Sequence, residues 1–435
     1  MTNICPFFTH HIGVDEEAHA FFAFYSEKFG PKMPLLFIGT NCGRCLLFSP
    51  NLLKQLAILH ADAQRRQIVA IGQWPFDERI KNAASQPPDT DYECIIWLHF
   101  RCFSIALFEF CTDDGTKMAN LRPLRELNTG HYGFCRAVAD PVGGRMFMPD
   151  HEEHSSSIRI RYRKGGDKLL VFGEQFMCRT WRRRTKHSAS NEGGMFNGLL
   201  MGVELLPGGQ DQLLLAFEDS TVCVFDLRTN EVLDALKHPK LPEFLCWSVL
   251  SVASDTADCA ALIAVSVIGQ LYLLSYSSGG GFVGDDANDD DDETEEYQTK
   301  PLQLLRAECK VKKCRRESEC TALALCSAQM DEQQPARRRM AIGFKNGAIE
   351  IRAIVPPPSG PSGVGWTTAP LVNCVFHTRS ICVLCWCLPS PFPDAKNGHG
   401  HSSDQCAPTA FRADCSPILF SGASDGNVSI FVLSQ

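Results

Sequence analysis

The stretch DQLLLAFEDSTVCVFDLRTN, residues 211–230, decides how the rest of the chain is interpreted. It consists of two short apolar runs on either side of the polar turn Glu218-Asp219-Ser220. Runs of this kind around a short polar turn predict a β-hairpin. A further apolar run, GLLMGVELL (198–206), precedes the hairpin, and another, EVLDALKH (231–238), follows it. The stretch is therefore the centre of a predicted unit of four strands.

The same pair of apolar runs around a small or polar turn recurs along the chain. The clearest copies are at 33–50, 259–276, 339–355 and 419–435. Less regular units lie at 67–110 and 133–163, which brings the total to seven. Seven four-stranded units with no helical periodicity between them predict an all-β fold, a single seven-bladed WD40-type β-propeller over residues 1–435. An α/β fold would need helices between the strands, and none is predicted.

The final hairpin, LFSGASDGNVSIFVLSQ (419–435), leaves its predicted blade without an outermost strand. A candidate for that strand is CPFFTHH (5–11), just before the first inner strand. An unpaired outer edge presents free backbone groups to other chains. We therefore expect 5–11 to pair with 427–433 and close the ring.

The spacing between units is uneven because several inserts interrupt it. Residues 164–193 form a basic segment that breaks the strand pattern and is expected to be irregular. Residues 280–299 contain an acidic tract, 285–296, which we expect to be a disordered loop because it has little apolar surface to bury. Pro/Gly/Ser-rich loops are predicted at 355–367 and 389–413. Long surface insertions of this kind cost little stability.

Composition narrows the class of protein. Hydrophobic residues make up 44% and charged residues 21%, which is typical of a globular chain. The net charge of -8 argues against a nucleic-acid binder, because such domains are usually basic. Many of the 21 cysteines lie inside apolar runs, which indicates buried thiols and a reducing compartment, the cytoplasm or the nucleus. We expect no signal peptide and no membrane span.

Several short motifs invite a metal or redox interpretation. HEEH (151–154) places its histidines three residues apart in a predicted loop, whereas zincins need a spacing of four on a helix. The pairs Cys42/Cys45 and Cys309/Cys314 are far apart in sequence and fall in different predicted blades, so they are not expected to form a four-ligand zinc site. The His-rich NGHGHSSD (397–404) is interpreted as a loop. No nucleophile elbow, P-loop or dinucleotide fingerprint is present. We therefore predict no catalytic residues, no metal, no cofactor and no small-molecule substrate.

Basic clusters lie at 179–187, 310–316 and 337–339. The first interleaves a tryptophan with arginines, and both types are enriched at interface hot spots. We select as candidate partner-binding residues Trp181, Arg182, Arg183 and Arg184. The alternatives are a solvated surface, an import signal or, least favoured, nucleic-acid binding.

The central hairpin resembles a WD repeat, with Phe225-Asp226 where the family has Trp-Asp. The last hairpin fits the same frame, with Phe431 in the tryptophan position. In that family a histidine, a strand Ser/Thr, a turn aspartate and the tryptophan form a hydrogen-bonded network within a blade. The resemblance implies such a network for His377, Ser421 and Asp425. It also assigns structural blade roles to Asp219, Asp226 and His238.

A narrower resemblance covers essentially the whole chain. Phe134-Cys135-Arg136 and Phe147-Met148-Pro149 resemble third-blade segments of a WD subfamily that contains guanine nucleotide-binding protein subunit β-like protein 1 and ASTRA-associated protein 1. Members of this subfamily are non-enzymatic. The resemblance implies a scaffold for the assembly and stability of phosphatidylinositol-3-kinase-related kinases, with a co-chaperone complex as partner. Residues 164–193 and the acidic and Pro-rich inserts depart from the subfamily pattern.

Two other functions are kept open. One is a WD adaptor of another complex, such as a ubiquitin ligase or a chromatin-associated assembly. The more remote one is a propeller hydrolase, which would need Asp, His and Glu side chains gathered in the central channel, because catalytic sites are defined by geometry more than by sequence order.

Overall fold

A computed structural model describes the chain in segments. These are 2–3, 5–25, 34–50, 52–75, 92–102, 104–112, 119–129, 135–140, 143–152, 155–162, 166–172, 199–206, 211–218, 221–237, 246–251, 261–267, 270–276, 319–328, 337–355, 367–387 and 417–433. All regular structure in these segments is β-strand. None of it offers a helix long and apolar enough to cross a membrane.

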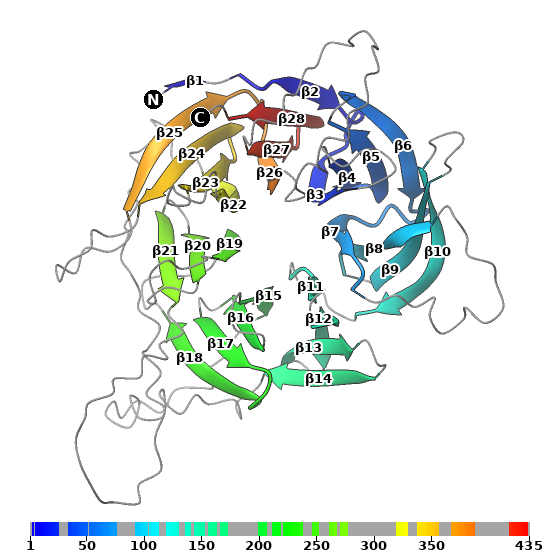
Figure 1. The fold of residues 1–435 in the computed structure, drawn as a ribbon, viewed down its shortest axis with the longest axis vertical. Coiled ribbons are helices and arrows are strands. Elements are labelled where there is room, and N and C mark those ends of the chain that lie inside the picture. The colour runs from blue at the N-terminus through cyan, green and yellow to red at the C-terminus, as the bar shows by residue number, and fades with distance from the viewer. Residues whose placement is uncertain are drawn as a thin grey trace, which may run out of the picture.

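The described strands pair into seven sheets, arranged radially around a central axis (Figure 1). Written from the innermost strand outward, the first four sheets are β3 (Ala18–Phe24), β4 (Leu35–Thr40), β5 (Arg44–Ser49), β6 (Lys54–Ala61); β7 (Ile68–Gln73), β8 (Tyr92–Phe100), β9 (Ser104–Thr112), β10 (Ala119–Asn128); β11 (Val138–Asp140), β12 (Arg145–Glu152), β13 (Ser155–Tyr162), β14 (Asp167–Phe172); and β15 (Leu200–Leu205), β16 (Gln212–Phe217), β17 (Thr221–Asp226), β18 (Glu231–Lys237).

The other three sheets contain the strands after β18 together with the N-terminal strands β1 and β2. They are β19 (Cys246–Ser251), β20 (Ala261–Val267), β21 (Gln270–Tyr276); β22 (Cys320–Ala328), β23 (Arg337–Phe344), β24 (Ala348–Val355), β25 (Thr367–Val375), β1 (Thr2–Asn3); and β26 (Ile381–Cys387), β27 (Ile418–Ala423), β28 (Asn427–Val432), β2 (Phe8–His11). This arrangement confirms the prediction of an all-β propeller. Six sheets have at least four strands, whereas the sheet of β19 has three described ones. Residues 277–318, which follow β21, lie outside the described residues.

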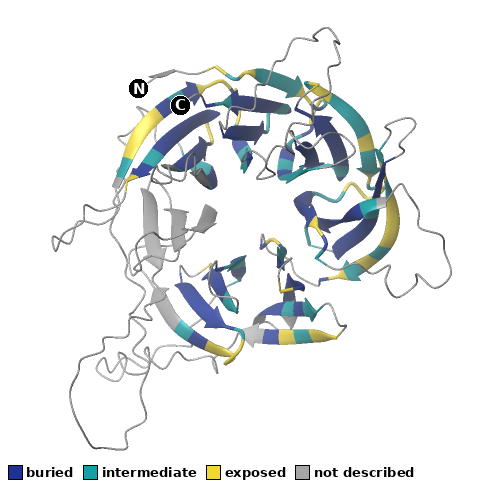
Figure 2. Ribbon diagram, in the orientation of Figure 1, coloured by how far each residue is buried: buried dark blue, intermediate teal, exposed yellow. Residues whose placement is uncertain are grey.

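Burial follows position within each sheet. The middle strands β4 and β17 are buried at every residue, which explains the consecutive apolar residues LLFI in β4 and VCVF in β17. The outer strands β6 and β10 carry exposed residues throughout their length (Figure 2). Neighbouring sheets pack through large side chains: the rings of Phe37 in β4 and Phe110 in β9 meet edge to face, with centroids 5.2 Å apart. The core is therefore a series of interfaces between sheets.

Two parts of the sequence prediction need correction. Residues 164–193 were expected to be irregular throughout, but Asp167–Phe172 forms β14 and pairs with β13. The apolar run LLVF within this range supplies the outer strand that the third sheet needs. HEEH was expected in a loop, but β12 extends through Glu152 and pairs His151 with Ser156. Residues 173–193 of the basic insert, the acidic tract and the loop 389–413 lie outside the described residues.

The N-terminal segment joins two sheets of the C-terminal part. Strand β2 pairs antiparallel with β28, in a register that places Phe8 opposite Ile430 and His11 opposite Asn427. The Thr9 and Ser429 hydroxyls lie 3.1 Å apart across this pair. Strand β1 adds a short parallel pairing with β25, which the sequence did not suggest. The expected contact between residues 5–11 and 427–433 is thus present.

Candidate functional site

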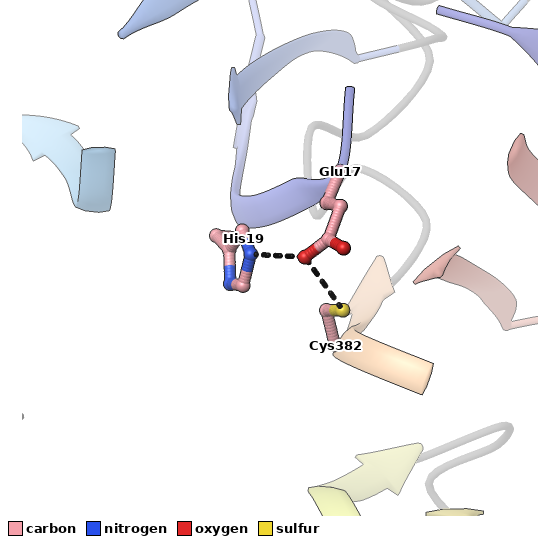
Figure 3. Close-up of side chains that lie close together, drawn as sticks. All are labelled: Glu17, His19 and Cys382. Atoms are coloured by element: carbon pink, nitrogen blue, oxygen red, sulfur yellow. Dashed lines mark hydrogen bonds and ion pairs between the residues drawn. The ribbon is translucent and has the colours of Figure 1, made fainter. Parts of the chain in front are cut away.

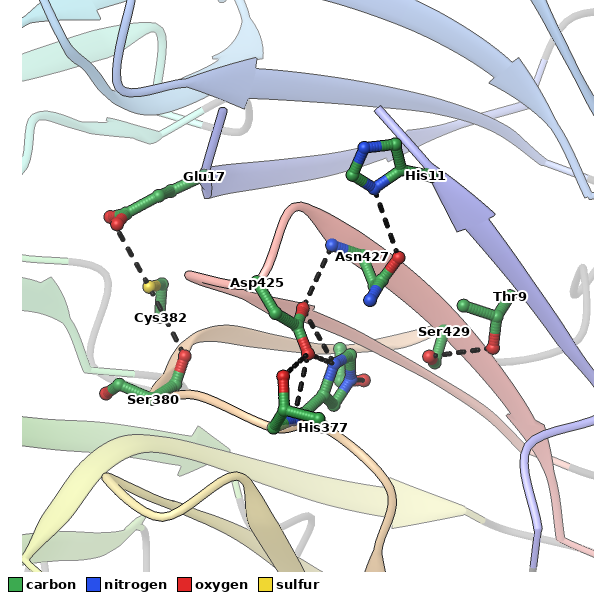
Figure 4. Close-up of polar contacts among 11 residues, drawn as sticks. Thr9, His11, Glu17, His377, Ser380, Cys382, Asp425, Asn427 and Ser429 are labelled. Carbon is green, nitrogen blue, oxygen red and sulfur yellow. Dashed lines mark hydrogen bonds and ion pairs between the residues drawn. The ribbon is translucent and has the colours of Figure 1, made fainter. Parts of the chain in front are cut away.

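The last sheet contains a hydrogen-bonded group made from residues far apart in the chain. His377 precedes β26, Ser421 lies in β27, and Asp425 lies in the β27–β28 turn. The Nε2 atom of His377 is 2.9 Å from the Ser421 hydroxyl, and its Nδ1 atom is 3.3 Å from both carboxylate oxygens of Asp425 (Figure 4). The structure therefore brings together the three residues that the WD resemblance grouped.

Backbone amides complete the surroundings of Asp425. The amide of Thr378 donates to Oδ2 and the amide of Asn427 donates to Oδ1, each at 3.0 Å. One amide belongs to the segment before β26 and the other to the first residue of β28. The carboxylate therefore links the start of β26 to the start of β28. Such charge-assisted hydrogen bonds are stronger than neutral ones.

The protonation states follow from burial and these partners. Burial lowers the pKa of His377, against the opposing effect of the Asp425 charge, and favours a neutral ring. Burial alone would raise the pKa of Asp425, but the hydrogen bonds from Thr378, Asn427 and His377 bring this pKa below its ordinary value. A neutral His377 donates from Nδ1 to Asp425 and accepts at Nε2 from Ser421, which satisfies all three side chains.

The order Ser-His-Asp also matches the hydrogen-bond order of a catalytic triad. Ser421 is 0% exposed and His377 is 2% exposed. A substrate carbonyl has no path to a hydroxyl that is buried in this way. The group can hold the turn and the inner strand in place, and it is not arranged to attack a substrate.

The other sequence candidates have different outcomes. Asp226 ends β17, and its Oδ1 accepts from the amides of Arg228, at 2.7 Å, and Thr229, at 3.0 Å. This is an aspartate-stabilised turn within its own hairpin. The remaining candidates lie outside the described residues: Asp219, His238, Trp181, Arg182, Arg183 and Arg184.

The described cysteines are all free thiols. Cys45 is fully buried, and burial raises the pKa of its thiol. Cys42 lies in the β4–β5 turn, and its sulfur is 3.3 Å from the hydroxyl of Thr40 at the end of β4. Cys309 and Cys314 lie outside the described residues.

A second polar group was missed by the sequence reasoning. Glu17 precedes β3, His19 is the second residue of β3, and Cys382 is the second residue of β26. The Nε2 atom of His19 is 3.0 Å from Glu17 Oε2, and the Cys382 sulfur is 4.0 Å from the same oxygen (Figure 3). No local sequence motif could predict this group, because Cys382 is 365 residues from Glu17.

Comparisons with solved structures agree with this architecture. The β-propeller domain of Cps50 (Swd1) from Myceliophteria thermophila superposes with a TM-score of 0.54 at 11% identity, covering 99% of both chains. The fold is a β-propeller. Raptor from Chaetomium thermophilum gives a TM-score of 0.51 at 10% identity, with 99% of this chain but 29% of that chain covered. This β-propeller thus spans under a third of the Raptor chain. No protein-family model and no curated protein sequence matches the sequence of the present protein.

Proposed function

We propose that the chain is a non-enzymatic protein-interaction scaffold that acts in the assembly and stability of phosphatidylinositol-3-kinase-related kinases, together with a co-chaperone complex. The observation that carries the scaffold function is the β-propeller fold itself, which the chain shares with the Cps50 (Swd1) propeller domain. The kinase assignment rests on the sequence resemblance at 134–136 and 147–149. Cytoplasm and nucleus are the proposed locations.

A propeller suits this role for a physical reason. Its sheets pack into a rigid body, and connecting loops on rigid bodies carry binding contacts at low entropic cost. We assign partner contact to Trp181, Arg182, Arg183 and Arg184. Arginine forms paired hydrogen bonds to carboxylates, so the partner surface is expected to be acidic.

We also propose that the seven sheets are seven blades of one ring and that β2 closes it. The support is the pairing of β2 with β28, which gives the final sheet its fourth strand. A closed ring removes an exposed edge that would otherwise pair with other chains.

Native affinity purification followed by mass spectrometry tests the kinase assignment. The wild-type chain is expected to recover the kinases and their co-chaperones. Changing Arg182, Arg183 and Arg184 together to Ala is expected to reduce this recovery. The matched control changes Lys310, Lys312 and Lys313 to Ala, which removes the same amount of charge from another basic cluster.

The same purification separates the alternatives. Recovery of cullin-type or histone-containing complexes in place of the kinases would support an adaptor of a ubiquitin ligase or a chromatin assembly. Equal recovery by the arginine variant and the wild type would show that the three arginines do not contact the partner, without contradicting the scaffold function.

Deleting 285–296 in the same assay tests the acidic tract, since unchanged partners would make this tract a passive spacer.

A further inference from the structure

Three potential metal ligands meet at the inner edge of the ring, where the first and last inner strands, β3 and β26, begin. They are Glu17, His19 and Cys382, and one ligand atom from each lies within 4.8 Å of the other two. Figure 3 shows Glu17 and His19 at the start of β3, facing Cys382 on β26. Strand β26 packs directly beside β3. The group therefore spans the seam between the two ends of the chain.

Backbone bulges place two of these side chains. In β3, Ala18 pairs with Thr40 and Ala20 with Gly39, so His19 is the extra residue of a bulge. In β26, Ile381 pairs with Ala423 and Val383 with Gly422, so Cys382 is the extra residue of the same kind of bulge. A bulge redirects the side chain of its extra residue, and bulges are common beside functional sites.

The same bulge recurs in other described inner strands but carries different chemistry there. The corresponding extra residues are Val69 in β7, Met201 in β15 and Thr321 in β22. Valine and threonine are not ligands for first-row divalent metals, and methionine prefers softer ions. Among these positions, strong ligands for such metals occur only at the two neighbouring strands where the chain ends meet.

The third ligand is held in place by its backbone. The amide of Glu17 donates to Asn41 Oδ1, and the amide of Asn41 donates to the Glu17 carbonyl, both at 3.0 Å. This reciprocal pair anchors Glu17 to the β4–β5 turn. Ligands that are fixed before binding lose less entropy when the metal arrives.

The donor types and spacing fit zinc. Zinc binds imidazole nitrogen, thiolate sulfur and carboxylate oxygen at about 2.0–2.3 Å, so its ligands lie roughly 3.3–3.7 Å apart in a tetrahedron. The observed separations of 3.0 and 4.0 Å from Glu17 bracket this range. Small side-chain rotations would bring all three atoms to one centre, with water as the fourth ligand.

The charges around the group also matter. Burial lowers the pKa of His19, against the effect of Glu17, and the positive charges of Arg136 and Arg101 lower it further, so the imidazole is in its neutral, metal-binding form. Burial and the charges of Glu17 and Asp425 raise the pKa of Cys382 to about 12, so the free thiol keeps its proton. The two arginines disfavour a cation, whereas Glu17 and Asp425 favour one. Binding would release the thiol proton to solvent as the sulfur–metal bond forms.

We propose that Glu17, His19 and Cys382 bind one Zn²⁺ that cross-links β3 to β26 and fastens the seam of the ring. The cross-link joins residues 365 apart in sequence. Tying such distant residues together removes much of the freedom of the unfolded chain. The metal therefore acts as a structural clasp beside the β2–β28 pairing.

Cobalt substitution of the purified full-length chain tests the site. After chelator treatment and dialysis, Co²⁺ is titrated, and about one equivalent is expected to produce a thiolate-to-cobalt charge-transfer band and the visible bands of four-coordinate cobalt. Zn²⁺ should abolish both. Cys382→Ser should lose the charge-transfer band, and His19→Gln should weaken binding at least about tenfold. Zn²⁺ should raise the Tm of the wild type and not that of Cys382→Ser.

The control is Cys42→Ser, which removes a half-buried thiol from the neighbouring turn. It should bind cobalt as the wild type does. Circular dichroism establishes whether each variant is folded. If a variant is not folded, Glu17→Gln, which keeps the thiol, is used in its place. Glu17→Gln should show the charge-transfer band only at a higher cobalt concentration than the wild type. A wild type without the band, or a band that survives in Cys382→Ser, would overturn the proposal.

Discussion

Among single residues, His377, Ser421 and Asp425 form a hydrogen-bonded network that needs all three side chains. In the neighbouring sheet, Cys320 pairs with Phe344 as Ile381 pairs with Ala423 in the last one. By this register Asn346 takes the place of Asp425, and Ile342 takes the place of Ser421. Asn346 still accepts from the amide of Ala348 in its turn, at 3.1 Å. The turn interaction is thus retained where the histidine network is lost.

Asp425→Ala is expected to destabilise the protein by about 1–3 kcal/mol, because it leaves the His377 ring and the Thr378 amide without their acceptor. Urea denaturation monitored by tryptophan fluorescence measures the change. Asp425→Asn is the control: it keeps an oxygen acceptor and should lose less. Equal losses in the two variants would show that hydrogen-bond acceptance at this position is unimportant.

The buried histidines should make stability depend on pH. Because burial lowers the folded-state pKa of His377, the unfolded chain binds more protons than the folded chain as pH falls below about 6.5. Stability is therefore present above that pH and decreases below it. His19 and His60 have pKa values that burial lowers in the same way and should contribute to the slope.

Changing His377 to Gln should thus flatten part of the fall in stability between about pH 7 and pH 5. The measurement is the midpoint of urea unfolding at several pH values for variant and wild type. Lys54→Gln, an exposed change on β6, is the control and should keep the wild-type slope. Parallel curves for His377→Gln and wild type would contradict the linkage.

At the scale of elements, glycines at the hairpin turns combine a backbone requirement with close packing. Gly426 has a φ of +77°, and a Cβ there would lie 2.8 Å from the Gly13 carbonyl oxygen. Its own carbonyl accepts from the amide of Ile12 at 2.9 Å. The β27–β28 turn is therefore shaped to receive the N-terminal segment.

Gly426→Ala should cost more than about 2 kcal/mol, since it adds a steric conflict to the cost of a left-handed alanine. Gly166→Ala isolates the second contribution. Gly166 has a φ of +89° with nothing near its Cβ position, so the loss should stay at about 1–2 kcal/mol. Thermal unfolding measures the loss of stability in both variants. A smaller loss for Gly426→Ala than for Gly166→Ala would refute the packing argument.

At the scale of the whole molecule, the N-terminal segment connects the two ends of the chain. Phe8 in β2 packs near Phe48 in β5, with ring centroids 6.0 Å apart, while its backbone pairs with β28. The segment thus contacts the first and the last sheets together. Its removal would expose the edge of β28 and part of the core below it.

Deleting residues 1–11 is expected to lower the Tm by several degrees and to promote aggregation through the exposed edge. Deleting only 1–4 removes β1 and leaves β2 in place, so it should have a smaller effect. Differential scanning calorimetry and light scattering measure the two results. If the longer deletion unfolds at the wild-type temperature, β2 does not close the ring.

The β-propeller class could be predicted because hairpins are local. The apolar runs of β16 and β17 and the turn between them are consecutive in the sequence, and their periodicity alone indicates paired strands. The limits of the inserts were less accurate. The strand Asp167–Phe172 contains the apolar run LLVF, but the basic segment that follows it interrupts the strand pattern and hides it.

The strands, the turns and their repetition could be predicted from local patterns in the sequence. It also pointed to His377, Ser421 and Asp425, through a pattern that repeats within a family. The contact of Glu17 and His19 with Cys382 could be recognised only in the folded chain, because no periodic pattern links positions 365 apart. The radial packing of the sheets places β3 beside β26 and brings the bulged residues of these two strands close together.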